Sequence, residues 1–243
     1  MSNYYYDGSF DGLLTVIYVA YNDRESKMLR VNAKAEQLIL ALDDIHIITD
    51  FSKARRVEKS ICEKLSQNFL NNIRTCFLSN DKNKDTVIIH TVYKALKYGE
   101  EILNSLDEHA FYMNKLVKQV LNERHRYLGL LRFKEMKDGI MFSTIEPKNN
   151  VLPILISHFK NRMKREKFAI FDKGRKMIAY YDGNKVEIVF VESLKIEWSD
   201  EEIEYSELWK TFHKSISIKE RENKKLQQSN IPKYYWKHLI EDM

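Results

Sequence analysis

The sequence predicts an α+β protein with a helical N-terminal half, a central antiparallel sheet of order ββ-α-βββ, and a helical C-terminal tail. Apolar residues recur every four positions in the first half, as at Val57, Ile61 and Leu65, which is the spacing of one helix face. After Leu128 the pattern changes to short apolar runs separated by turn residues, which is typical of strands. A charged, helical pattern resumes at Asp200.

The N-terminal half is expected to consist mainly of helices. Ser9 follows the turn residues Asp7 and Gly8 and can cap the first helix. The second helix is expected to extend from Ser52 to about Leu78 and to be long and amphipathic. Residues 33–42 are ambiguous, and residues 46–49 have a strand-like composition. Further helices are expected over residues 86–96, 100–106 and 108–126.

The central sheet is expected to contain strands over residues 130–134, 140–145, 168–171, 177–181 and 186–191. A helix over residues 151–163, with Pro153 in its first turn, separates the second strand from the third. The closing helix extends from Asp200 to about Gln228, and Ile231-Pro232 ends it. The corresponding regions are 1–127, 128–198 and 199–243. Because the chain has only 7 Gly and 3 Pro, we expect these regions to form one integrated domain.

Composition is compatible with nucleic-acid binding and argues against a membrane protein. The net charge is +5 and the isoelectric point is near 8.9, which is mildly basic. On one shared helix, Cys62 and Cys76 would lie about 21 Å apart, too far for a disulfide, so a reduced, cytoplasmic protein is expected. No apolar run approaches the roughly 20 residues of a membrane span, and the N-terminus lacks a signal-peptide pattern.

Several short motifs occur in order along the chain. They are Tyr6-Asp7-Gly8-Ser9-Phe10-Asp11-Gly12-Leu13-Leu14, Glu123-x-His125-Arg126, Glu146-Pro147, Val151-Leu152-Pro153, His158-Phe159-x-x-Arg162, Asp172-x-x-Arg175, Arg221-x-Asn223-x-x-Leu226-Gln227 and Pro232-x-Tyr234-Tyr235-Trp236. Through these motifs the chain resembles a bacterial family of DNA repair and DNA metabolism proteins that carry the domain of unknown function 4130 (DUF4130). Tyr127 and Ile231 depart mildly from the family pattern, where Met is expected.

The resemblance implies a protein of DNA repair or modification that works with a radical-SAM partner. Some members of the family carry a uracil-DNA-glycosylase-like domain after the shared region. This sequence stops at Met243, so we do not expect glycosylase activity from it. The closely spaced cysteines of a radical-SAM cluster are also absent, so the chain is not expected to be the radical enzyme itself. No cofactor is expected.

A cluster of cations extends from residue 160 to residue 176, where the only acids are Glu166 and Asp172. With Phe159 and Phe168 beside it, this composition is typical of proteins that hold phosphates and stack on bases. The alternative is a solvated helix end, where cations favour the helix dipole. The cations are Lys160, Arg162, Lys164, Arg165, Lys167, Lys173, Arg175 and Lys176.

Two histidines, His125 and His158, could act as general acids or bases, because imidazole titrates near neutral pH. They could also bind a metal, although the ligand spacing of known metal motifs is missing, or form structural hydrogen bonds. A separate alternative concerns the carboxylates of Glu123, Glu146 and Asp172. These could simply form internal ion pairs with the cations of Arg126, Arg162 and Arg175.

The leading hypothesis is therefore an accessory protein of DNA repair or modification that binds nucleic acid, with DNA the expected form, and works with a radical-SAM partner. Its nucleic-acid-binding candidates are Arg126, Arg132, Arg162, Arg165, Arg175 and Lys176, with His125 and His158 facing the ligand. The first alternative is an enzyme acting on a nucleotide or nucleic acid, with His125 or His158 as acid/base and the arginines on phosphate. The sequence has no recognisable catalytic motif.

The second alternative is an interaction adaptor that uses the aromatic tail of Tyr234, Tyr235 and Trp236. These rings are also expected to dock onto the main body, because an exposed Trp is costly to leave idle. A pocket holding His125, His158 and Arg162 together would favour the enzyme. A flat basic surface would favour simple binding, and an exposed aromatic patch would favour the adaptor.

Overall fold

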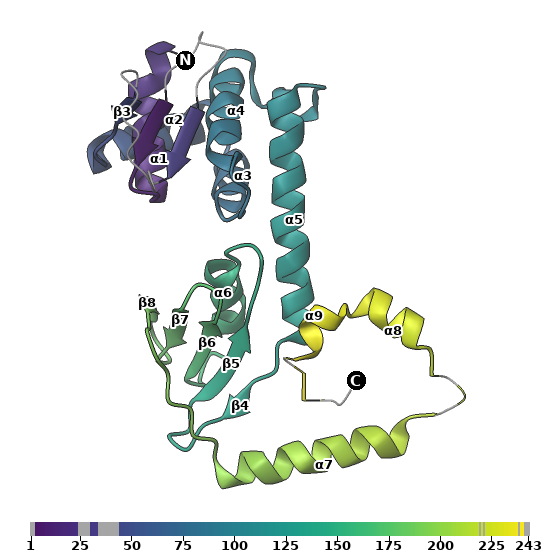
Figure 1. Cartoon of the computed structure of the whole chain (residues 1–243). Helices are drawn as coiled ribbons and strands as arrows, with labels where there is room; N and C mark the ends of the chain where they lie inside the picture. Colours follow the sequence, from purple (N-terminus) through teal and green to yellow (C-terminus); the bar gives the residue numbers. More distant parts are fainter. Residues whose placement is uncertain are drawn as a thin grey trace. The chain divides into compact units, whose positions relative to one another are not determined.

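The computed structural model describes residues 3–23, 30–33, 44–218, 220, 222–237 and 239–240. The chain divides into two compact units, Met1–Asn122 and Glu123–Met243 (Figure 1). The ambiguous residues 34–42 and the family residue Arg221 lie outside the described residues. The expectation of one integrated domain stays a prediction.

The N-terminal unit contains a small parallel sheet that the sequence did not predict. Its central strand β1 (Asn3–Tyr6) is the aromatic run, and it pairs in parallel with β2 (Arg30–Ala33) and β3 (Asp44–His46) in the order β2-β1-β3. The side chains of Tyr4 and Tyr6 are buried, so aromatic residues that could suggest a surface patch instead form part of the core.

Helices make up most of the rest of this unit. They are α1 (Phe10–Val19), the 3-10 helix η1 (Ala20–Asp23), α2 (Phe51–Lys64), α3 (Gln67–Phe77), α4 (Lys84–Tyr98) and the 3-10 helix η2 (Glu100–Asn104). The Ser9 hydroxyl accepts a hydrogen bond from the Gly12 amide, which confirms the predicted cap of α1. The helical character expected for this half is thus confirmed.

The single long helix predicted from Ser52 to Leu78 is wrong. The chain leaves the helix at Leu65, and Ser66 begins α3 by accepting a hydrogen bond from the Phe69 amide. The apolar spacing continues across the break because both helices pack on the same core. That core includes the fully buried residues Leu13, Leu14, Ile17, Ile61, Phe69, Leu70 and Ile73.

The C-terminal unit is built around a five-stranded sheet, which begins after α5 (Glu108–Leu130), the helix that spans the boundary between the units. Its strands are β4 (Lys134–Glu135), β5 (Met141–Ile145), β6 (Phe168–Asp172), β7 (Met177–Tyr181) and β8 (Val186–Phe190), in the order β4-β5-β6-β7-β8. The strand predicted over residues 130–134 is wrong, because α5 continues to Leu130 and β4 begins only at Lys134.

The sheet is antiparallel except at its centre, where β5 and β6 are parallel. Helix α6 (Leu152–Arg162), with Pro153 in its first turn as predicted, connects these two strands and packs against β6 and β7 (Figure 1). Such a crossover carries the chain from the C-terminal end of β5 back to the N-terminal end of β6. The two ends of α6 therefore lie at opposite ends of these strands.

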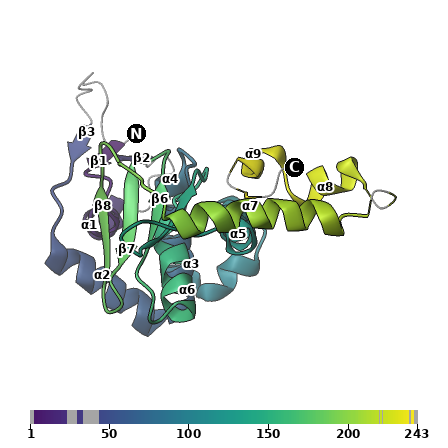
Figure 2. The same cartoon turned by 90° about the horizontal axis from the view of Figure 1, so that it is seen from below.

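The C-terminal tail contains α7 (Asp200–Ile216), α8 (Lys224–Asn230) and α9 (Lys233–Trp236), which follow one another in Figure 2. Ser199 caps α7 through the Glu202 amide. The prediction of one helix to Gln228 is wrong, since α7 ends at Ile216 and Asn223 caps a separate α8. Among the described residues, no helix has both the length and the apolar character that crossing a bilayer requires.

Candidate nucleic-acid interface

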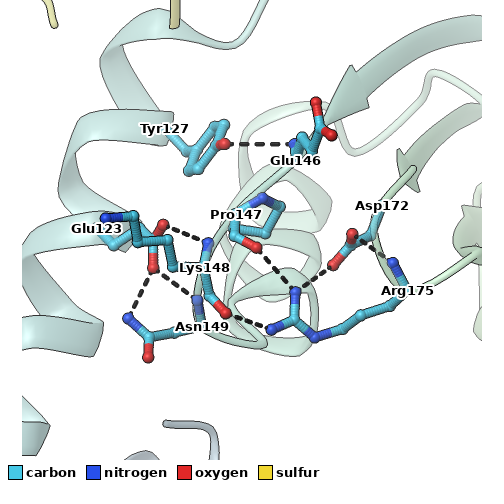
Figure 3. A network of polar contacts seen from close by, with 8 residues as sticks. All are labelled: Glu123, Tyr127, Glu146, Pro147, Lys148, Asn149, Asp172 and Arg175. Carbon is cyan, nitrogen blue, oxygen red and sulfur yellow. Dashed lines mark hydrogen bonds and ion pairs between the residues drawn. The ribbon is translucent and has the colours of Figure 1, made fainter. Parts of the chain in front are cut away.

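The loop between β5 and α6 is held by two opposite charges, one on each side of its backbone (Figure 3). On one side, the buried carboxylate of Glu123 on α5 accepts hydrogen bonds from the amides of Lys148 (2.7 Å) and Asn149 (2.9 Å). The Asn149 side-chain amide donates a further hydrogen bond of 2.7 Å to the same carboxylate. A buried acid is thereby satisfied by the N–H groups of the loop.

On the other side, the Arg175 guanidinium binds the carbonyl groups of this loop. It donates to the Pro147 carbonyl at 3.0 Å and to the Lys148 carbonyl at 2.5 Å. It also forms an ion pair of 3.0 Å with the fully buried carboxylate of Asp172, which accepts the Arg175 amide as well. Arg175 and Glu123 together form what we call the loop clamp.

Within the loop clamp, Arg175 has a structural role. Its donors are directed at internal acceptors, so the internal ion-pair interpretation holds for Asp172 and Arg175. The other expected pairs do not form as proposed. Glu123 is bound to loop amides, and Glu146 pairs with Lys237 near the end of the chain.

Five cations form a basic surface at the other end of the strands, where α6 ends and β6 begins. We call this surface the basic corner; its members are the half-buried Lys160 and the exposed Arg162, Lys164, Arg165 and Lys167. The hydroxyl of Tyr181 fixes this corner, because it donates to the Gly183 carbonyl (2.6 Å) in the β7–β8 turn and also lies within hydrogen-bond distance of the Lys164 carbonyl (3.3 Å). Within the part of the chain that the structure describes, no member forms an ion pair with a carboxylate.

The structure separates the basic corner from Arg175 and Lys176. Helix α6 has 11 residues, so its ends are about 16 Å apart, and Arg162 lies at one end while the clamped loop lies at the other. Lys176 is exposed in the β6–β7 turn, where it adopts a left-handed backbone conformation with φ of 53°. The cation-rich stretch of the sequence thus forms two surfaces.

The aromatic residues beside the basic corner are not available to stack on bases. Phe159 is 4% exposed and Phe168 is fully buried, and both rings pack against Phe133 at centroid distances of 5.1 and 5.6 Å. The sequence placed them next to the cations correctly, but their side chains face the core. The basic corner can therefore contact phosphates without reading bases.

The remaining predicted site residues are dispersed. His125 and Arg126 are exposed on α5, and His158 on α6 packs its ring against Phe159 at 5.3 Å. The guanidinium of Arg132 donates to the carbonyls of Gly129 and Leu131. No contact among the described residues joins His125 to His158, and no cluster of His, Cys, Asp and Glu there could hold a metal.

The aromatic tail is partly docked onto α5. Tyr235 is buried, and its ring packs edge-on against Tyr127 at 5.1 Å, while Trp236 donates its indole N–H to the Ile231 carbonyl at 2.7 Å. Burial raises the pKa of Tyr235, and a hydrogen bond from Arg126 partly offsets this shift. Tyr234 keeps 39% of its surface exposed and Trp236 is half-buried, so of the three rings Tyr234, Tyr235 and Trp236 only Tyr234 is largely exposed.

Comparison with known proteins gives a family and little more. The model of a protein family described as a domain of unknown function, DUF4130, matches residues 82–241. No curated protein matches the chain. A solved structure of a DHH domain, titled as a member of a family of ribosomal proteins, is similar with a TM-score of 0.35 and 15% identity, over 72% of this chain and 38% of that one. A likeness of this size supports no conclusion about function.

Proposed function

We propose that this chain, which belongs to the DUF4130 family, is a nucleic-acid-binding protein that holds the phosphate backbone through its basic corner. The observation that carries the proposal is the exposure of Arg162, Lys164, Arg165 and Lys167 without an internal carboxylate partner among the described residues. Unpaired cations on a fixed surface attract phosphates and release counterions on binding. The mild positive charge of the whole chain, +5, is consistent with this role.

Arg175, which the sequence predicted to contact nucleic acid, is not among the residues that we assign to the ligand. Arg175 already donates to two backbone carbonyls and one buried carboxylate, so it contributes to the fold. Arg162 and Arg165 are the residues that we assign to phosphate. Because the neighbouring aromatic side chains are buried, binding through this surface is expected to depend on salt and not on base sequence.

The test is fluorescence anisotropy of labelled single- and double-stranded DNA over a range of salt concentrations. The Arg162→Ala/Arg165→Ala variant is expected to bind about tenfold more weakly and to lower the salt slope by about 1.5–2. The matched control is Lys185→Ala/Lys195→Ala, which removes the same charge from cations already paired with Glu187 and Glu197. Equal loss of affinity in both variants would show that binding depends only on the net charge of the protein, and it would contradict a local site.

A role in DNA repair or modification with a radical-SAM partner stays a prediction from the family resemblance. Among Tyr234, Tyr235 and Trp236, Tyr234 is the ring most available to such a partner, since Tyr235 is buried and Trp236 is half-buried. Co-purification of a co-expressed radical-SAM protein with the wild type but not with Tyr234→Ala would support this partnership. Loss of co-purification only with variants of the basic corner would instead indicate bridging by nucleic acid.

A further inference from the structure

A groove in the N-terminal unit has no role in the function proposed above. Its volume is about 460 Å³, within the range of small-molecule sites. It is lined by residues of α1, η1, α2 and α4: Ile17, Tyr18, Tyr21, Arg56, Val57, Ser60, Lys64 and Leu96. All of these residues belong to the N-terminal unit, so the groove is independent of the basic corner.

The groove combines an apolar floor with exposed aromatic rings. Ile17 and Val57 are buried at 2% and 8% exposure, whereas Tyr18 and Tyr21 keep 36% and 37% of their surfaces exposed. Tyr21 is held by an edge contact with Tyr93, at a centroid distance of 5.7 Å. Aromatic rings that are fixed and still exposed can stack on a planar ligand.

The charged residues that line the groove are all cations. The Arg56 guanidinium lies 5.3 Å from the centroid of the Tyr18 ring, and Lys64 follows it two helical turns later on the same face of α2. Neither cation forms an ion pair among the described residues. The nearby acids of α2 are already occupied, because Glu58 pairs with Arg74 and Glu63 with Lys59.

These features together favour a ligand that is both planar and anionic. Arg56 and Lys64 are exposed and can contact an anionic group, while the exposed parts of the Tyr18 and Tyr21 rings can contact a planar one. A nucleotide satisfies both groups, with its base on the rings and its phosphate on the cations. Arg56 and Lys64 are about 12 Å apart along the helix axis, and their long side chains can reach phosphates on either side of one nucleotide unit.

We infer that this groove binds a nucleotide, stacking the base on Tyr18 and Tyr21 and contacting phosphate through Arg56 and Lys64. The same chemistry is present in a free nucleotide and in one unit of a single-stranded nucleic acid. The site would supply base contact that the basic corner lacks. It does not depend on the basic corner, since a different unit carries it.

The first experiment measures binding of adenosine 5′-monophosphate, adenosine and ribose 5-phosphate to the full chain by isothermal titration calorimetry. The intact nucleotide is expected to bind about tenfold or more tightly than either fragment, because only it engages rings and cations together. Arg56→Ala is expected to weaken nucleotide binding about tenfold. The matched control is Arg55→Ala, which replaces the preceding residue of α2, a likewise exposed arginine that does not line the groove.

The second experiment distinguishes the two sources of the nucleotide. A short single-stranded oligonucleotide is titrated into the Arg162→Ala/Arg165→Ala variant, with and without Arg56→Ala, so that failure of the basic corner does not hide the groove. If Arg56→Ala weakens oligonucleotide binding there, the ligand is a strand, and if only the mononucleotide is affected, the ligand is free. The inference would be overturned if neither the mononucleotide nor the strand bound to the wild-type groove. It would also be overturned if Arg55→Ala and Arg56→Ala lost equal affinity.

Discussion

Replacing Glu123 tests the loop clamp, since this carboxylate accepts the amides of Lys148 and Asn149 together with the Asn149 side chain. Hydrogen bonds to a charged group contribute about 1.5–3 kcal/mol each, and leaving a buried N–H unsatisfied costs about 1–3 kcal/mol. Glu123→Ala is therefore expected to lower the free energy of unfolding of the C-terminal unit by about 3–5 kcal/mol. Glu123→Gln keeps one acceptor oxygen and is expected to cost about 1–2 kcal/mol.

Tryptophan fluorescence during urea unfolding is the appropriate assay. All 3 tryptophans, Trp198, Trp209 and Trp236, lie in the C-terminal unit, so the signal reports on that unit alone. The control is Glu201→Ala, which removes an exposed acid from α7 and is expected to change the free energy by no more than about 0.5 kcal/mol. A loss below about 1 kcal/mol for Glu123→Ala would refute the reasoning, because water would then be satisfying the loop amides.

A double-mutant cycle examines whether the two sides of the clamp act together. Arg175→Met removes the donors to the Pro147 and Lys148 carbonyls, on the face of the loop opposite to Glu123. Because both residues hold the same peptide segment, the combined variant with Glu123→Gln is expected to deviate from additivity by about 1–2 kcal/mol. Strict additivity would show that each residue stabilises the loop independently.

Three further predictions concern the N-terminal unit. Gly12→Ala places a methyl group 2.4 Å from an Asp7 carboxylate oxygen and 2.7 Å from the Tyr6 ring, so thermal unfolding followed by circular dichroism should show a loss of about 1–3 kcal/mol or more, and an unchanged melting curve would contradict this crowding. Burial raises the pKa of Asp85, so this carboxyl keeps its proton to higher pH in the folded state than in the unfolded state. The free energy of unfolding should therefore fall as pH rises above about 4, and Asp85→Asn should remove that dependence on pH. A pH dependence that persists in Asp85→Asn would point to another group. Burial raises the pKa of Cys76 to about 12, so a thiol reagent should modify Cys62 alone in the native protein and both cysteines in denaturant, and rapid native modification of Cys76 would refute its burial.

Local sequence patterns predicted elements whose stability depends on near neighbours. Ser9 caps α1, Pro153 lies in the first turn of α6, and the β6–β8 meander follows the alternating runs and turn residues. These features follow from capping, fixed φ angles and strand periodicity, which act over a few residues. The overall α+β class was accessible for the same reason, whereas the family was identified from a resemblance of short motifs distributed along the chain.

Patterns that continue across a break gave incorrect boundaries. The four-residue apolar period runs through Leu65, where the helix nevertheless ends, because both α2 and α3 face one core and Ser66 supplies a new cap. Likewise, Tyr4 and Tyr6 form the central strand of a parallel sheet whose partners lie far along the chain. Such pairing is non-local, so a single run of residues does not reveal it.

The sequence by itself determined the residue types of the candidate sites: a cation-rich stretch, carboxylates, and aromatic residues beside them. The tertiary structure decided which of these charges are occupied. Arg175 and Arg162 are similar in sequence context, yet Arg175 pairs with the buried Asp172 three residues earlier and donates to carbonyls of the loop before α6, whereas Arg162 is exposed at the other end of α6. The reason is physical, since the availability of a charge depends on which partners the fold brings within a few ångströms. For Arg175 these include the carbonyls of Pro147 and Lys148, which precede it by 28 and 27 residues.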